Sequence, residues 1–157
     1  MLMSSLSELA DQAEYIASKN NQLKAHWRTY QNALTQAVAL SSHNINHEFT
    51  CSNERGIHFV LFNHFIISIH LQADFYSQQI VYSLNMAQPG EPEDFQAFSR
   101  ATLTEDGRID NAVDIHDRQA VLDHYLNKIA AIYQCIYDAI HSSTPIHPQL
   151  EKLIKAF

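Results

Sequence analysis

Apolar side chains recur at intervals of three and four residues through residues 6–37. On an α-helix this spacing puts them on a single stripe, repeated over about five heptads. Ser5 and Glu8 form a capping box that starts the helix, and the polar run 41–44 breaks the pattern after Leu40. The sequence therefore predicts a helix of roughly 35 residues and about 50 Å, which is longer than one globular core needs.

Shorter stretches in which apolar and polar residues alternate follow this helix. Alternation with a period of two is typical of half-buried strands. The stretches are 45–51, 57–61, 65–71, 76–84 (with Tyr76 as its first apolar residue), 95–104 and 109–113. Turn residues separate them at 53–56, 72–74, 88–92 and 105–108, and the last turn holds an Asp-Gly pair, a strong hairpin signal. Such short connections predict an antiparallel meander of about five to six strands.

A second helical pattern begins after the acidic residues within 114–117, which suit a positive helix N-terminus. At ~100° per residue, its apolar positions from Val121 to Ile140 fill an arc of about 160°. An arc this wide is expected to cover the sheet on one side and to meet the first helix on the other. The chain thus predicts an α+β fold, with one domain over residues 1–145 and a short tail over 146–157 that Pro148 would open as a helical turn.

The composition argues against several classes of function and location for this protein. A net charge of −7, with ten scattered Lys and Arg residues, argues against a sequence-independent grip on nucleic acid. The two cysteines stand alone, which fits a reduced cytosolic protein better than a disulfide framework. No secretory signal is evident, and the apolar run 57–71 is too short and too interrupted by His and Asn to span a bilayer. We therefore expect a cytoplasmic protein.

Motifs for catalysis are missing from the sequence. It holds no Gly-rich phosphate loop, no G-x-S-x-G elbow and no H-E-x-x-H, and it has only three glycines. Asp110, Asp114 and Asp117 are interpreted as turn and helix-start carboxylates. The sequence predicts a protein that is not an enzyme and that carries no cofactor.

Ten histidines are the one compositional excess. His43 and His47 are four residues apart, which on a helix places both on one face, and His58 would lie opposite His70 in a hairpin centred on residues 63–64. These four are weak metal-ligand candidates, since no acidic or thiolate partner completes a tetrahedral set at fixed spacing. A second hypothesis needs no metal: protonation of several histidines between roughly pH 7 and 6 would change the affinity for a partner.

The long first helix has two interpretations, and the sequence leaves both open. It packs in part against its own domain, or it forms a homodimeric coiled coil. Asn20, at a seam position, resembles the buried polar residue that fixes register in such coils. Against a parallel pair, Lys19 and Lys24 would face each other across the seam.

Specific strings link the chain to a known family. They are 13–17, Trp27, Tyr30, Asn32, Leu34, 59–62, 64–65, 106–107, 109–110, 117–118, the unbroken run 121–130, Tyr133, Tyr137 and 139–140. On these residues the chain resembles the HycA family of formate hydrogenlyase regulatory proteins over most of residues 13–145. Residues 86–100 and the tail after Pro145 are least similar.

The resemblance implies a negative regulator of anaerobic formate metabolism. Such a protein opposes the formate-responsive, sigma-54-dependent transcriptional activator that switches on the formate hydrogenlyase and hydrogenase maturation genes. It would do so by protein–protein contact, as one α+β regulatory domain without direct contact to nucleic acid. The family offers no catalytic residue to place on this sequence.

The partner surface and two rival functions follow from the residues. The polar flank of the first helix, at Lys19, Lys24, His26 and Arg28, is the candidate partner-binding surface, with a solvated helix face as the alternative. One rival function is a sensor that binds formate or a related anion at Arg100, Arg108 or Arg118. The other is a metal-handling accessory protein for hydrogenase maturation, using His43 and His47.

Overall fold

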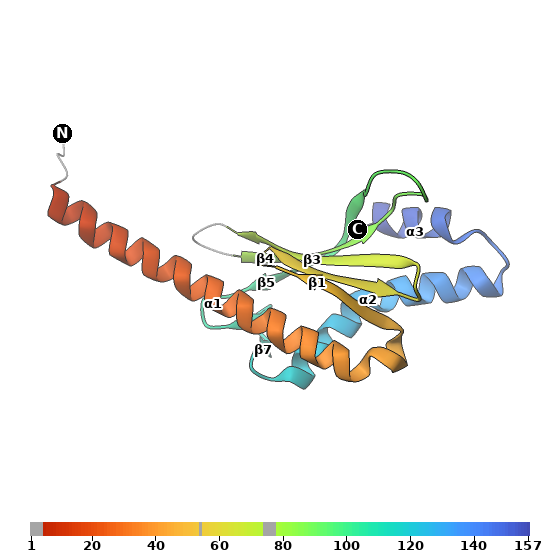
Figure 1. Cartoon of the computed structure of the whole chain (residues 1–157), viewed down its shortest axis with the longest axis horizontal. Helices are drawn as coiled ribbons and strands as arrows, with labels where there is room; N and C mark the ends of the chain where they lie inside the picture. Colours follow the sequence, from red (N-terminus) through yellow and green to blue (C-terminus); the bar gives the residue numbers. More distant parts are fainter. Residues whose placement is uncertain (1–4, 54, 74–77) are drawn as a thin grey trace.

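The computed structural model describes residues 5–53, 55–73 and 78–157; the predicted turn residues 54 and 74 and the predicted strand residue Tyr76 lie outside these ranges. The chain begins with a long helix, continues through a sheet and ends with two helices (Figure 1). In order, the elements are α1 (Leu6–Ile45), β1 (His47–Ser52), β2 (Gly56–Leu61), β3 (Phe65–Ala73), β4 (Gln78–Asn85), β5 (Phe95–Leu103), β6 (Arg108–Ile109), β7 (Val113–Asp114), α2 (Arg118–His141) and α3 (Ile146–Lys155).

The sheet is an antiparallel meander, as predicted. Within the described residues it has seven strands in sequential order, and the two-residue strands β6 and β7 raise the number above the predicted five to six. The Asp-Gly pair lies in the turn between β5 and β6, where Gly107 has a φ of 77°. This left-handed conformation is one that glycine adopts without steric cost.

The first helix extends past its predicted end, to Ile45 rather than Leu40. Its polar residues 41–44 stay helical, because a last turn at the surface tolerates polar side chains. The helix ends at Asn46, whose φ of 51° is left-handed and whose N–H donates to the carbonyl of Ser42. Asparagine is a common residue at such a terminus. As a result His47 is the first residue of β1 and not part of a helix that holds His43.

One apolar core joins the sheet to the helices. The C-terminal half of α1 and most of α2 pack on the same sheet face, as the sequence predicts. Tyr82 of β4 marks this contact, because its hydroxyl hydrogen-bonds the Tyr30 hydroxyl of α1 at 2.9 Å and its ring contacts Tyr125 of α2. Helix α3 adds to the same core through buried Leu150 and Ile154.

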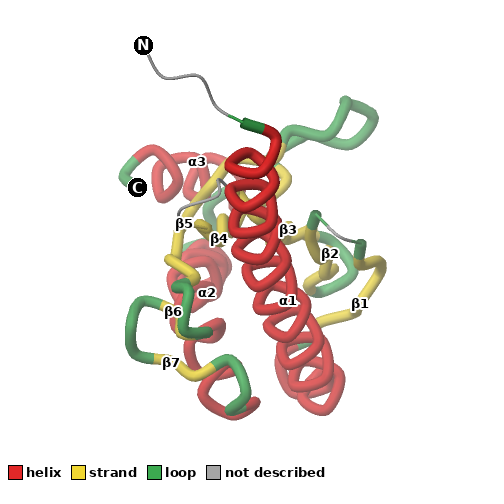
Figure 2. Tube along the Cα trace, turned by 90° about the vertical axis from the view of Figure 1, so that its left-hand side faces the viewer, coloured by secondary structure: helices red, strands yellow, loops and turns green. Residues whose placement is uncertain are grey.

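The N-terminal part of α1 projects beyond the sheet as an extended arm, here defined as residues 6–18 (Figures 1 and 2). All of its side chains are exposed, and burial begins only at Leu23. The first contact between α1 and the rest of the protein lies at the β5–β6 turn, where Glu105 contacts Lys19 and the ring of His26. None of the described helices is both long and apolar enough to cross a membrane.

Candidate interaction surfaces

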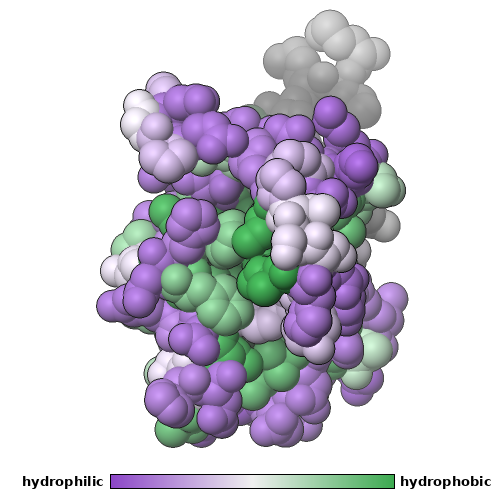
Figure 3. All heavy atoms as spheres, turned by 90° about the vertical axis from the view of Figure 1, so that its right-hand side faces the viewer, coloured by the Kyte–Doolittle hydropathy of each residue, from purple (hydrophilic) through white to green (hydrophobic). Residues whose placement is uncertain are grey.

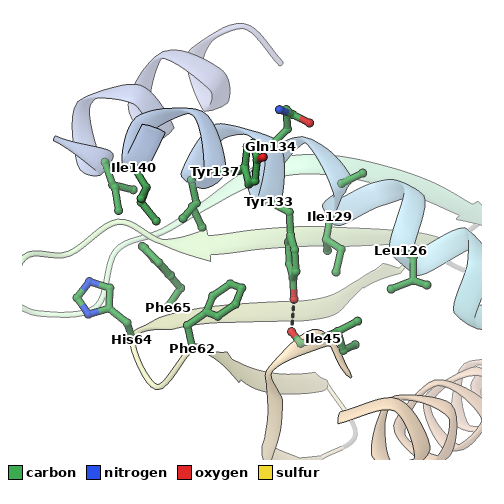
Figure 4. Close-up of a pocket in the computed structure, with 13 residues that line it drawn as sticks. Ile45, Phe62, His64, Phe65, Leu126, Ile129, Tyr133, Gln134, Tyr137 and Ile140 are labelled. Carbon is green, nitrogen blue, oxygen red and sulfur yellow. Dashed lines mark hydrogen bonds between the residues drawn. The ribbon is translucent and has the colours of Figure 1, made fainter. Parts of the chain in front are cut away.

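An apolar groove of about 910 Å³ lies between α2 and the β2–β3 hairpin (Figure 4). Figure 3 shows apolar side chains gathered in a hollow on this end of the molecule. None of the lining side chains is an Asp, Glu, Lys or Arg. They are Ile45, Phe62, His64, Phe65, Leu126, Ile129, Ala130, Tyr133, Gln134, Ile136, Tyr137, Ile140 and Ile146. A concave, aromatic and uncharged surface of this size is a typical binding site.

Helix α2 builds one wall of the groove because it extends past the end of α1 (Figure 1). The wide apolar arc of α2 was expected to meet the sheet and the first helix. In its last turns part of the arc meets neither: Tyr137 is 59% exposed and Ile140 is 62% exposed. The wall residues Leu126, Ala130, Tyr133, Tyr137 and Ile140 follow a spacing of four, three, four and three residues. This is the spacing at which one helix packs against another.

The β2–β3 hairpin supplies the opposite wall through an unusual turn. Phe62 and Asn63 both have left-handed backbones, with φ values of 55° and 54°. For a bulky residue such as Phe this conformation costs of the order of 1–3 kcal/mol. The neighbouring structure maintains it, since the Phe62 N–H donates to the carbonyl of Asn46 at 2.9 Å and the Phe62 ring packs on Tyr133. Strained residues of this kind concentrate at functional sites.

A buried polar cluster lies beneath the groove. His47 Nδ1 is 3.1 Å from the carbonyl of Ile45, and its Nε2 is 2.7 Å from the hydroxyl of Tyr125. The hydroxyl of Tyr133 donates to the same carbonyl. These contacts fit a neutral imidazole that donates from Nδ1 and accepts at Nε2. Burial lowers the pKa of His47, although the hydrogen bond to the Ile45 carbonyl acts in the opposite direction.

The stability of the protein is expected to fall as the pH drops below about 6.5, the ordinary pKa of histidine. Burial lowers the pKa of His47, and it is also the main cause that lowers the pKa of His70 and of His124. Below the ordinary histidine pKa, these histidines bind protons in the unfolded chain but remain neutral in the folded chain. Each such histidine then lowers the free energy of unfolding by up to about 1.4 kcal/mol for each pH unit of acidification. Thermal unfolding midpoints between about pH 7.5 and 5.5 measure the effect. His47→Gln should flatten the profile, and a wild-type midpoint that is constant over this range would contradict the prediction.

The predicted partner-binding residues of α1 differ in their surroundings. Lys19 Nζ is 3.3 Å from a Glu105 carboxylate oxygen, and His26 Nε2 is 2.9 Å from the Glu105 carbonyl. Both side chains therefore contact a turn of their own chain. Lys24 and Arg28 are exposed.

The structure separates His43 from His47 and places His58 and His70 as diagonal neighbours on strands β2 and β3. His43 is exposed at the end of α1, whereas His47 is buried in β1. The hairpin is centred on Asn63, so that His58 pairs with Ser68 and His70 with Gly56. The prediction that His58 lies opposite His70 was therefore wrong, because the strands pair two residues out of the predicted register. No cluster of three or more His, Cys, Asp or Glu side chains that could hold a metal occurs among the described residues.

The predicted anion anchors have different surroundings. Arg100 donates to Gln72 Oε1 at 2.9 Å. Burial is the main cause that lowers the pKa of His70, and the charges of Arg100 and His58 lower this pKa further. The Arg108 guanidinium is 3.8 Å from an Asp106 carboxylate oxygen, and Arg118 is exposed at the start of α2.

The three aspartates have the structural roles that the sequence predicts. Asp117 caps α2 by accepting a hydrogen bond from the Ala120 N–H, and Asp114 accepts one from the His116 N–H. Asp110 joins the sheet to α2: its Oδ1 accepts from the Thr102 N–H at 2.8 Å and its Oδ2 is 3.1 Å from His124 Nε2. Burial by itself raises the pKa of Asp110, but these hydrogen bonds outweigh it and the pKa is lowered.

Comparison with known proteins identifies the family. A family described as a transcriptional repressor of the hyc and hyp operons matches residues 4–152. The formate hydrogenlyase regulatory proteins HycA of Escherichia coli strain K12, of Escherichia coli O157:H7 and of Shigella flexneri are each 38% identical over 148 residues, which cover 94% of this chain and 94% of each relative. No solved structure matches the chain.

These matches agree with the resemblance carried by the helix and strand residues. The family consists of transcriptional regulators, which are not a class of enzyme. Since both the family match and the curated relatives span nearly the whole chain, the protein belongs to the HycA family of negative regulators of formate hydrogenlyase.

Proposed function

We propose that this protein lowers expression of the formate hydrogenlyase genes by binding their formate-responsive, sigma-54-dependent activator in the cytoplasm. The net charge of −7 does not favour a direct grip on DNA. The observation that carries the proposal is the apolar groove, which leaves Phe62, Tyr137 and Ile140 exposed. Aromatic and large aliphatic side chains in a concave setting are the usual anchors of protein interfaces.

The occupant that we propose for the groove is an amphipathic helix of the activator. The wall residues from Leu126 to Ile140 cover about 21 Å along α2, or roughly four turns. Their alternating spacing of three and four residues suits the apolar stripe of a second helix. The uncharged lining would leave a charged segment without partners. The exposed Lys24 and Arg28 are a second candidate contact, for acidic side chains of the activator.

The test mixes the purified protein with the activator, with and without formate, and measures complex mass by light scattering. We expect a complex that formate weakens. If no complex forms under any condition, contact with the activator is excluded. A rise in melting temperature on adding formate would then favour the anion sensor. Uptake of one equivalent of nickel or zinc, lost in the double variant His43→Ala and His47→Ala, would favour the metal-handling protein.

A further inference from the structure

Two histidines lie on the face of the sheet opposite to α1 and α2. His58 of β2 follows Ile57, and His70 of β3 follows Ile69. Both isoleucines are fully buried in the core that the sheet shares with the helices. Since successive side chains of a strand point to opposite faces, the two histidine side chains point away from that core. Both are only partly buried, so an ion in solution can reach them.

The strand register brings an arginine to the same place. His70 pairs with Val81 of β4, and Val81 pairs with Arg100 of β5, so the three side chains form one row across the sheet. His58 is the diagonal neighbour of His70, because it pairs with Ser68, two residues before His70. Neighbouring strands lie about 4.8 Å apart, which puts the backbones of His70 and Arg100 roughly 10 Å apart. Two long side chains can reach one small ion from opposite sides across this distance.

Serines lie beside these basic residues. Ser68 of β3 and Ser83 of β4 pair with each other and continue the row that begins at His58. They are 6% and 2% exposed, and neither hydroxyl has a hydrogen-bond partner among the described residues. The rings of His58 and Phe95 come from β2 and β5 and are 5.2 Å apart, so they extend over the two strands that carry the serines. Buried hydroxyls without a partner are uncommon, and these two are donors that a ligand beside the histidines could use.

The described residues supply no carboxylate to balance this cluster. Arg100 donates to the amide oxygens of Gln72, at 2.9 Å, and Gln79, at 3.5 Å, and none of the described carboxylates forms an ion pair with it. Burial is the main cause that lowers the pKa of His70, and the charges of Arg100 and His58 lower it further. The three basic groups therefore repel one another when they are charged. An anion placed between them would offset that repulsion.

We propose that this face of the sheet binds a phosphate group between Arg100 and the two histidines. A tetrahedral phosphate accepts hydrogen bonds from several directions, so the guanidinium, the imidazoles and a serine hydroxyl can each bind a different oxygen. A carboxylate has two oxygens, which one guanidinium satisfies, and it would leave the histidines without a partner. The amide of Gln72 holds the guanidinium on one side and leaves its other N–H groups for the ligand. The proposal does not depend on the partner that the groove binds.

The first test is the melting temperature of the full chain at increasing concentrations of inorganic phosphate, with chloride keeping the ionic strength constant. We expect a saturable rise for the wild type. In Arg100→Gln the affinity should fall about tenfold or more, because a charged hydrogen bond is lost. The matched control is Arg108→Gln, since Arg108 lies on β6 beside an Asp106 carboxylate, and it should bind as the wild type does. A wild type without a saturable rise overturns the proposal, as does an unchanged affinity in Arg100→Gln.

Parallel titrations with formate and with glycerol 3-phosphate define the chemistry of the ligand. Saturable binding of formate without binding of phosphate overturns the phosphate site and favours the rival anion sensor. If glycerol 3-phosphate binds more tightly than inorganic phosphate, the site recognises a phosphorylated metabolite. If it binds equally or more weakly, the free ion is the ligand.

The affinity for sulfate tests the part played by the histidines, because this tetrahedral anion keeps its charge between pH 7.5 and 6.5. The titratable and charged groups that face the site are His58 on β2, His70 on β3 and Arg100 on β5, and the described residues of β4 add none. An anion favours the protonated imidazole, so binding should tighten as the pH falls, by up to about tenfold per pH unit for each histidine that takes up a proton. The double variant His58→Gln and His70→Gln should lose this dependence while its circular dichroism is unchanged. A wild-type affinity that is constant over the range overturns the proposal.

Discussion

The double variant Tyr137→Glu and Ile140→Glu is expected to lose binding to the activator and to lose repression with it. Both side chains lie in the groove with more than half of their surface exposed, so the folded monomer should tolerate the change. In a complex each carboxylate would be buried without a partner, which costs several kcal/mol. Loss of an anchor side chain alone costs about 2 kcal/mol or more, or roughly 30-fold in affinity.

Affinity for the activator, measured by calorimetric titration, and expression from a hyc reporter are the two readouts. The matched control is Leu40→Glu, which places the same charge at a leucine that is 77% exposed on α1 and outside the groove. The control should bind and repress as the wild type does. If the double variant keeps its affinity while its circular dichroism is unchanged, the groove is not the contact surface.

The architecture could be predicted because local signals in the sequence agree with the final packing. Ser5 accepts a hydrogen bond from the Glu8 N–H at the start of α1, as the capping box predicts. The alternating stretches became antiparallel strands because their connections are too short for crossovers. The end of α1 was misplaced because polar residues near a helix end carry little information. The better signal was Asn46, since asparagine tolerates the left-handed terminus.

The groove was not predicted because it depends on how far α2 extends past the end of α1. No local pattern encodes that difference in length. Two signals were present in the sequence: the arc of α2 is wider than one contact needs, and the run 59–65 places Phe62 in the turn. The buried environment of His47 was not predicted, for a related reason. Its buried contacts with Ile45 and Tyr125 come from separate elements, and only the fold brings these together.

The substitution Gly56→Ala is expected to cause the largest loss of stability of any change proposed for this protein. A Cβ atom built on Gly56 would lie 2.4 Å from the carbonyl oxygen of Ile69 and 3.0 Å from the Cα of His70. Both are backbone atoms of β3, which pairs with β2 at this position. Because no side chain can rotate away, the strands must separate, and we expect a cost of about 3 kcal/mol or more.

Urea unfolding of the purified variant measures this loss, with Gly90→Ala as the control. Gly90 has a φ of 86° and no atom within 4 Å of its would-be Cβ, so its substitution carries only the backbone strain of about 1 kcal/mol. The two variants thus separate a steric clash from a conformational preference. If Gly56→Ala is no more destabilised than Gly90→Ala, then β3 is not held against β2 at this end. The hairpin that positions Phe62 in the groove would then be held by the other β2–β3 pairs and by the contacts of Phe62 with Asn46 and Tyr133.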